Sequence, residues 1–126
     1  ERRRTGPMET TRDLVETVDA AIPPKVRQQA RKEPATRVFQ ALRIAVNEEL
    51  QHLERALESE LFDVLAPGGR LAVITFHSLE DRLVKNAFQD SQRWQTTTRK
   101  PLAAAPAEVR INPRSRSAKL RTAIKQ

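Results

Sequence analysis

A short strand-forming run, LAVITF at residues 71–76, constrains the fold of this chain more than any other feature. It follows Pro67, Gly68 and Gly69, and the first two of these suit the central positions of a type II turn. The run does not alternate between apolar and polar residues, which is typical of a strand covered on both faces in a parallel sheet. Helical spacing precedes the run and resumes from residue 79. This order of helix, strand and helix predicts an open α/β sheet, in which ligands collect at the carboxyl ends of the strands.

Polar residues follow this strand immediately, in the sequence FHSLEDR. His77 and Ser78 are therefore expected at the strand end, where such folds place their chemistry. Ser78 and Asp81 also have the spacing of a capping box, and Glu80 would complement the dipole of the following helix. His77 can hydrogen-bond a ligand or satisfy a buried backbone carbonyl. These residues alone leave the functional and the structural interpretation open.

Apolar residues recur at helical spacing from residue 38 to residue 64, which predicts one long helix. We expect it to pack one face on a core along its whole length. Gln40, Arg43 and Asn47 form a polar stripe on the shoulder of that face. Such a stripe indicates a half-buried site, a seam between domains, or a boundary whose polar groups are satisfied locally.

The first part of the chain is predicted to form a short helix and a basic connection. Thr10 and Asp13 have the spacing of a capping box, and Pro23 with Pro24 ends the helical pattern. Residues 25–34 carry four cations and almost no apolar side chains. They indicate either a solvated connection or an RNA-facing surface.

The net charge of +7 is unevenly distributed. Residues 38–90 carry five basic and nine acidic side chains, whereas residues 91–126 carry nine basic and one acidic. A tail of one sign attracts polyanions, so nucleic acid is the expected partner.

Two segments make up this basic tail. Residues 91–111 lack periodicity and are predicted to form a long surface loop, in which Trp94 either stacks on a base or, as we favour, pins the loop to the core. An Asn-Pro turn then leads to a half-buried final strand at residues 120–125, which we expect at an edge of the sheet. The cations of this turn and strand are Arg114, Arg116, Lys119 and Arg121.

Composition excludes several classes of protein. The chain has no cysteine and two histidines, so we expect neither disulfides nor a metal site. It has no apolar stretch of about 20 residues that would span a bilayer. A cytoplasmic protein is the expectation.

Three blocks of the sequence, in this order, resemble one family. PATRVFQALRIAVNEELQHLERAL, LAPGGRLAVITFHSLEDRLVK and NPRSRSAKLRTAIK are similar to the carboxyl-terminal half of the RsmH (MraW) family of 16S rRNA cytosine-N4 methyltransferases. ERRRTGPMETTRDLVETV is similar to the helical insertion of that family. The resemblance implies a partial Rossmann-like class I methyltransferase sheet at residues 34–126, preceded at residues 1–33 by the end of an inserted helical domain.

The resemblance also implies S-adenosylmethionine as cofactor and 16S rRNA of the small ribosomal subunit as partner. His77, Ser78 and Glu80 would then line a pocket for the target base. The tail cations Arg114, Arg116, Lys119 and Arg121 would hold phosphates, and Arg37 and Arg43 would join them in contacting RNA. The glycine-rich cofactor loop of such enzymes follows their first strand, and the three glycines of this chain do not occupy such a position. We therefore expect a part of a longer enzyme that neither binds the cofactor nor methylates RNA by itself.

Two other classes of function stay open from the residues. A stand-alone RNA-binding module would explain the basic tail, although an aromatic content of 4% is low for a base-stacking surface. A structural or interaction domain would explain the long amphipathic helix. If the chain instead holds only part of a Rossmann-like sheet, as the resemblance implies, it is expected to self-associate.

Overall fold

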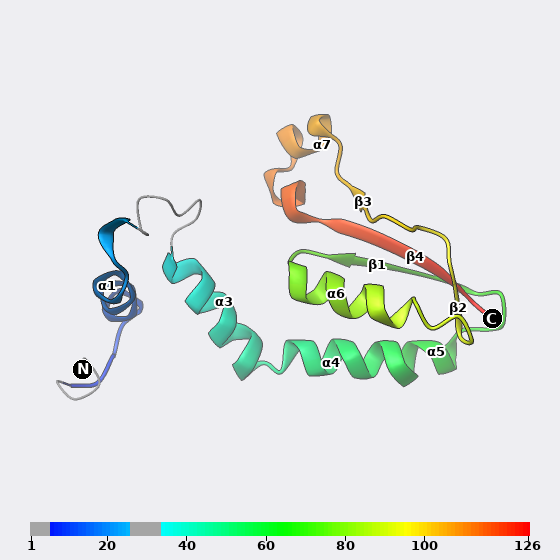
Figure 1. Ribbon diagram of the computed structural model, residues 1–126, viewed down its shortest axis with the longest axis horizontal. Coiled ribbons are helices and arrows are strands. Elements are labelled where there is room, and N and C mark those ends of the chain that lie inside the picture. Colours follow the sequence, from blue (N-terminus) through cyan, green and yellow to red (C-terminus); the bar gives the residue numbers. More distant parts are fainter. Residues whose placement is uncertain (1–5, 26–33) are drawn as a thin grey trace. The chain divides into compact units, whose positions relative to one another are not determined.

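The computed structural model describes residues 6–25 and 34–126 (Figure 1). The chain forms two compact units, residues 1–48 and residues 49–126. We expected a boundary between residues 33 and 34, whereas compactness divides the chain at residue 48. The assignment of residues 1–33 to an inserted domain stays a prediction, and most of the basic connection at residues 25–34 lies outside the described residues.

The first unit contains two described helices, α1 (Thr11–Ala21) and α3 (Pro34–Val46), which pack against each other. The predicted capping box of α1 is confirmed. The Thr10 hydroxyl accepts from the Asp13 amide at 3.1 Å, and the Asp13 carboxylate accepts from the Thr10 amide at 2.9 Å. The helix ends before the two prolines, as expected.

The long helix predicted over residues 38–64 is interrupted. After α3, Glu48 adopts a positive φ of 49°, in the left-handed region that L-residues rarely occupy and that no helix passes through. The chain then forms α4 (Glu49–Arg55), a π-helical turn (Ala56–Glu60) and α5 (Leu61–Val64). The single face on the core is therefore also wrong: Val46 is 79% exposed and Val64 is 80% exposed, whereas Leu57 is buried.

The second unit is built on a small antiparallel sheet. Its strands are β1 (Arg70–Thr75), β2 (Trp94–Thr96), β3 (Leu102–Ala103) and β4 (Lys119–Lys125), and its remaining helical segments are α6 (Ser78–Ala87), α7 (Pro106–Ile111) and a 3-10 turn (Pro113–Ser117). β4 is the central strand and pairs antiparallel with β1 on one side and with β2 and β3 on the other. The half-buried final strand is thus confirmed, but its expected place at an edge is wrong, because partners pair with it on both sides. The expected loop at residues 91–111 contains two short strands and a helix.

The environment of β1 corrects the sequence prediction. We expected a strand covered on both faces in a parallel sheet, but β1 pairs antiparallel with β4, and its burial alternates. Leu71 and Val73 are partly buried against the core, while Ile74 is 59% exposed. The burial of β1 alternates because, within the described chain, α6 packs against just one face of the sheet (Figure 1).

The core of this unit lies between α6, the helical segment from α4 to α5, and the sheet. Its buried members are Leu57, Val84, Phe88, Trp94 and Ala123. The Trp94 ring centroid lies 5.3 Å from that of Phe62 and 5.4 Å from that of Phe88. Trp94, 2% exposed, therefore pins its segment to the core, as we favoured from the sequence.

The turn before β1 also matches its prediction. Gly68 has a φ of 79°, which suits the third residue of a type II turn, and the Gly69 amide donates to the Ala66 carbonyl at 2.8 Å. The turn delivers the chain into β1, whose far end leads directly into α6. The functional candidates lie at that junction.

Candidate functional site at the start of α6

The junction between β1 and α6 is held by a capping box made of His77 and Glu80. His77 is the N-cap, and its Nδ1 accepts from the Glu80 amide at 3.3 Å. The Glu80 carboxylate accepts from the backbone amides of His77 at 3.1 Å and Phe76 at 2.8 Å. An Nδ1 that accepts is unprotonated, so the neutral ring carries its proton on Nε2.

The capping box predicted from Ser78 and Asp81 is wrong by one residue. The helix begins at Ser78 itself, which is exposed. His77 is the N-cap, and its imidazole takes the place of the hydroxyl or carboxylate that an N-cap usually supplies. Asp81 is thereby released for a different role. Of the three candidates for a base pocket, His77 and Glu80 hold each other, and only Ser78 has an exposed side chain.

Asp81 binds two cations of the final strand. Its carboxylate accepts from Nε and a terminal nitrogen of Arg121 at 2.8 and 3.2 Å, and from Nζ of Lys119 at 3.2 Å. Hydrogen bonding by Arg121 is the main reason that the pKa of Asp81 lies below its usual value. Burial acts in the opposite direction but is the smaller effect, and Lys119 lowers the pKa further. Arg121 is 7% exposed and so does not form the surface phosphate contact expected from the sequence.

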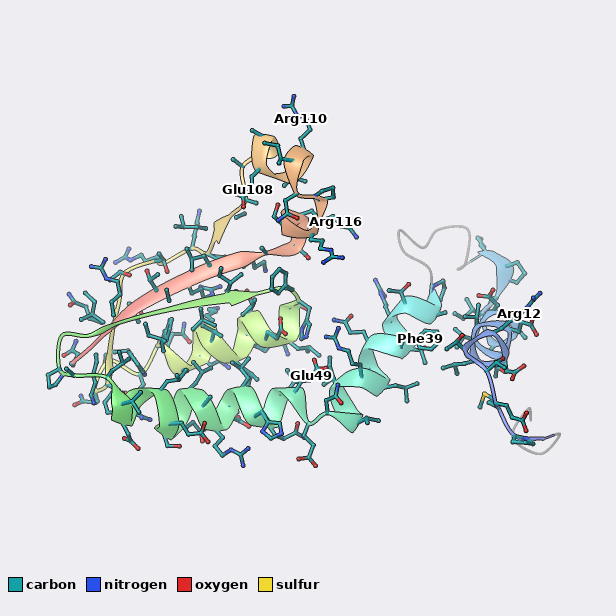
Figure 2. The ribbon with its side chains drawn as sticks, turned by 180° about the vertical axis from the view of Figure 1, so that it is seen from behind. Arg12, Phe39, Glu49, Glu108, Arg110 and Arg116 are labelled. Atoms are coloured by element: carbon teal, nitrogen blue, oxygen red, sulfur yellow. The ribbon has the colours of Figure 1, made fainter. Side chains whose placement is uncertain are left out.

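The remaining basic residues of the tail lie next to this junction. Thr75, the last residue of β1, is paired with Lys119, the first of β4, so the 3-10 turn that precedes β4 emerges beside the start of α6. Arg114 and Arg116 lie on this turn and are exposed, whereas Ser115 is buried and donates to the Asn112 carbonyl at 2.8 Å. Figure 2 shows Arg116 at this end of the sheet.

The polar stripe belongs to the first unit, and so does Arg37, which together with Arg43 of the stripe was expected to contact RNA. Gln40 is partly buried on α3, while Arg37, Arg43 and Asn47 are exposed. Arg43 and Asn47 both engage in interactions with other residues. A role for them as a seam or in RNA contact stays a prediction.

One group of side chains has the ligand types of a metal site. Ligand atoms of Glu49, His77 and Glu80 all lie within 4.8 Å of one another, and all three residues are partly buried. His77 Nε2 is buried and lies 3.2 Å from Glu80 Oε1, close but outside hydrogen-bond geometry. Because Glu80 and His77 already cap α6, the arrangement is explained without an ion.

Two cavities open elsewhere in the second unit. One, of about 290 Å³, lies between the helical segment and the end of α6, beside Leu57 and Trp94. The other, of about 200 Å³, is lined by Lys85, Arg99 and Arg121 among others. Neither contains a glycine-rich loop that would suit a dinucleotide or a similar cofactor.

Sequence reasoning missed the ion cluster of Asp81, Lys119 and Arg121. The available signal was the alternation of β4, which places Arg121 on the same face as Ala123, a buried residue. A cation on a buried face needs a carboxylate nearby. Which carboxylate supplies it depends on the pairing of β4 with β1, and that pairing is not visible in the sequence.

None of the helices in the described part of the chain is both long and apolar enough to cross a membrane.

Comparison with known proteins finds several relatives that share one name. The ribosomal RNA small subunit methyltransferase H of Trichormus variabilis is 55% identical over 120 residues, which are 95% of this chain and 39% of that protein. Its counterpart in Symbiobacterium thermophilum is 51% identical over 144 residues, covering 98% of this chain and 44% of that protein.

A third relative of the same name, from Synechococcus sp. (strain JA-2-3B'a(2-13)), is 57% identical over 119 residues. The chain spans roughly two fifths of the length of these relatives. The model of the MraW methylase family matches residues 1–126. With a match over its whole length, the chain belongs to the MraW methylase family.

Proposed function

We propose that this chain is the carboxyl-terminal part of an enzyme that methylates N4 of a cytidine in 16S rRNA of the small ribosomal subunit, using S-adenosylmethionine, in the cytoplasm. The names of the relatives support rRNA of the small subunit as the substrate. The specificity for N4 and the cofactor follow from the family resemblance of the FHSLEDR and NPRSRSAKLR blocks.

The sheet topology supports a Rossmann-like parent fold. β1 and β2 both run antiparallel to β4, so they are parallel to each other. Many doubly wound sheets carry one antiparallel strand near an edge of an otherwise parallel sheet. We propose that the parent sheet continues beyond the edge of β1 that pairs with no described strand.

The observation that carries the RNA-binding role is the pairing of Thr75 with Lys119. This register places the exposed Arg114 and Arg116 beside the carboxyl end of β1, where α/β enzymes bind their ligands. Guanidinium groups there would hold the phosphates that flank a target base without reading its identity. The Arg121 guanidinium, which is buried against Asp81, would support this surface from behind.

The chemistry of the proposed reaction assigns modest roles to this part. Cytosine N4 is a weak nucleophile because its lone pair is delocalised into the ring, so the amine must be held in line with the methyl group that S-adenosylmethionine supplies. The base must also leave its stack and enter a pocket. His77 and Glu80 would keep the strand end rigid as one wall of that pocket, and Ser78 would face the base.

The test uses the intact enzyme and purified small subunits. Replacing Arg114 and Arg116 with Ala should weaken binding and lower the slope of log affinity against log salt by up to about 2, at about 0.9 or less for each lost phosphate contact. Arg55→Ala is a matched control, because Arg55 is exposed and already lies 3.4 Å from Glu60. An unchanged slope in the double variant would assign both arginines to contacts within the protein.

A second measurement addresses the division of labour. The 126-residue chain alone should show no binding of S-adenosylmethionine by calorimetry, because its glycines do not form a cofactor loop. Micromolar binding to the isolated chain would contradict this proposal.

A further inference from the structure

We propose that the pocket beside the carboxyl end of α6 binds a phosphate group of the RNA backbone, as a second anchor point separate from Arg114 and Arg116. The pocket has a volume of about 200 Å³ and lies between α6, the chain that follows β2, and β4. This inference rests on the proposed function, because it takes RNA as the source of the phosphate.

The pocket is lined by cations from three separate elements. Lys85 comes from the last turn of α6, Arg99 from the segment after β2, and Arg121 from β4. None of the residues that line it is acidic. Three basic side chains line this hollow, and only Arg121 among them is paired with a carboxylate of the described chain, that of Asp81, so the lining favours an anion.

The three cations of the pocket differ in whether they already form an ion pair. Within the described part of the chain, no carboxylate forms an ion pair with Lys85 or Arg99, and both side chains are exposed. Arg121 is buried and paired with Asp81, but Lys119 shares that carboxylate, so the cluster keeps one net positive charge. The pocket is therefore lined by one buried cation that is already paired and by two exposed cations that no described carboxylate pairs.

Phosphate suits this lining better than a carboxylate does. An arginine fork matches the geometry of phosphate oxygens, and Lys contributes a point charge to the same group. Gln89 adds a neutral amide to the lining, and Thr98 is held in place because its hydroxyl accepts from the Thr122 amide at 3.0 Å. This hydrogen bond orders the backbone next to Arg99, whose own side chain is exposed.

The position of the pocket argues for the RNA backbone over a free anion. Arg121 lies two residues after Lys119 on β4, and both bind the same Asp81. A path of positive charge thus runs from Arg116 through Lys119 to the pocket. A polyanion that contacts the 3-10 turn can follow this path, whereas a free phosphate would use the pocket alone.

The experiment compares Lys85→Gln, Arg99→Gln and the double variant in the intact enzyme, with Arg55→Gln as control. With purified small subunits, each single variant should lower the salt slope by about 0.7 to 0.9, and the control should leave it unchanged. Inorganic phosphate should shift the amide resonance of Thr98 in the wild type and have no effect on it in the double variant. Gln keeps most of the side-chain length, and both residues are exposed, so folding should be preserved.

Each other outcome overturns the inference in a recognisable way. If the double variant keeps the wild-type salt slope while replacement of Arg114 and Arg116 lowers it, RNA binding stands and the pocket is not an RNA anchor. If phosphate shifts Thr98 but no variant changes RNA binding, the pocket serves another anion. If replacement of Lys85 and Arg99 and replacement of Arg114 and Arg116 all leave RNA binding unchanged, the RNA-binding role proposed for the tail fails together with this inference.

Discussion

At the scale of single residues, Asp81 is the residue whose role differs most from its predicted one. Its carboxylate pairs with Arg121 and Lys119 and does not cap the first turn of α6 as predicted. Removing one member of a buried charge pair leaves the other member desolvated and unpaired, which costs more than the pair contributes. Asp81 therefore connects α6 to β4 by a contact that tolerates little change.

We predict that Asp81→Asn lowers the free energy of unfolding at pH 7 by about 3 kcal/mol. The pKa of Asp81 is lowered in the folded state, so its contribution is present above the unfolded pKa and is lost as pH falls through the folded pKa. The wild type and the variant should thus differ at pH 7 and begin to converge only below about pH 4, as pH falls toward the lowered folded pKa.

Urea denaturation across this pH range measures the effect. Asp63→Asn serves as control, since Asp63 is exposed and should have no comparable effect at any pH. A difference between wild type and Asp81→Asn that is as large at pH 3 as at pH 7 would show that charge pairing is not its source.

At the scale of elements, the start of α6 shows how a helix can be capped by an unusual residue. His77 and Glu80 exchange hydrogen bonds with each other's backbone amides, and Glu80 holds the Phe76 amide as well. The Ser78 hydroxyl has no part in this cap. The two possible capping boxes are offset by one residue. Each therefore predicts that a different side chain, Glu80 or Ser78, stabilises the start of the helix.

Glu80→Ala should lower the free energy of unfolding by about 1 to 2 kcal/mol, because two backbone amides lose a carboxylate acceptor. Ser78→Ala, as the matched variant on the same turn, should change it by less than about 0.5 kcal/mol. Thermal or urea unfolding of both variants separates the two capping schemes. A larger loss in Ser78→Ala would restore the box predicted from the sequence.

At the scale of the whole molecule, the second unit presents an incomplete sheet. β1 has one edge that pairs with no described strand, and the outer face beside it carries Ile74 and Phe76, each more than half exposed. An apolar face next to an unpaired strand edge is a template for association with another chain. In the proposed parent enzyme, further strands would pair with this edge and helices would cover the face.

The isolated chain should therefore self-associate, by strand pairing or by exchange of helices. Light scattering across a concentration series should give a mass at or above twice 14.3 kDa. Ile74→Lys, placed on the exposed face, should shift this equilibrium toward monomer. A monodisperse monomer that unfolds cooperatively would show that these residues close a core without a partner.

The sequence by itself determined the local features of this protein. The box of Thr10 and Asp13, the turn at Gly68 and the strand-forming run before His77 are each decided by neighbouring residues, and the structure has all three. The burial of Trp94 also followed from its chemistry, because a large ring gains most by leaving water. The family resemblance rested on the same local blocks.

Only the tertiary structure decided how these pieces pair. The direction of β4 against β1, the exposed alternate face of β1 and the carboxylate that meets Arg121 all depend on contacts between residues far apart in the chain. The break at Glu48 was hidden because hydrophobic spacing continues across it. Periodicity records which face of an element is apolar, but the partner of that face is chosen by the packing of the whole sheet.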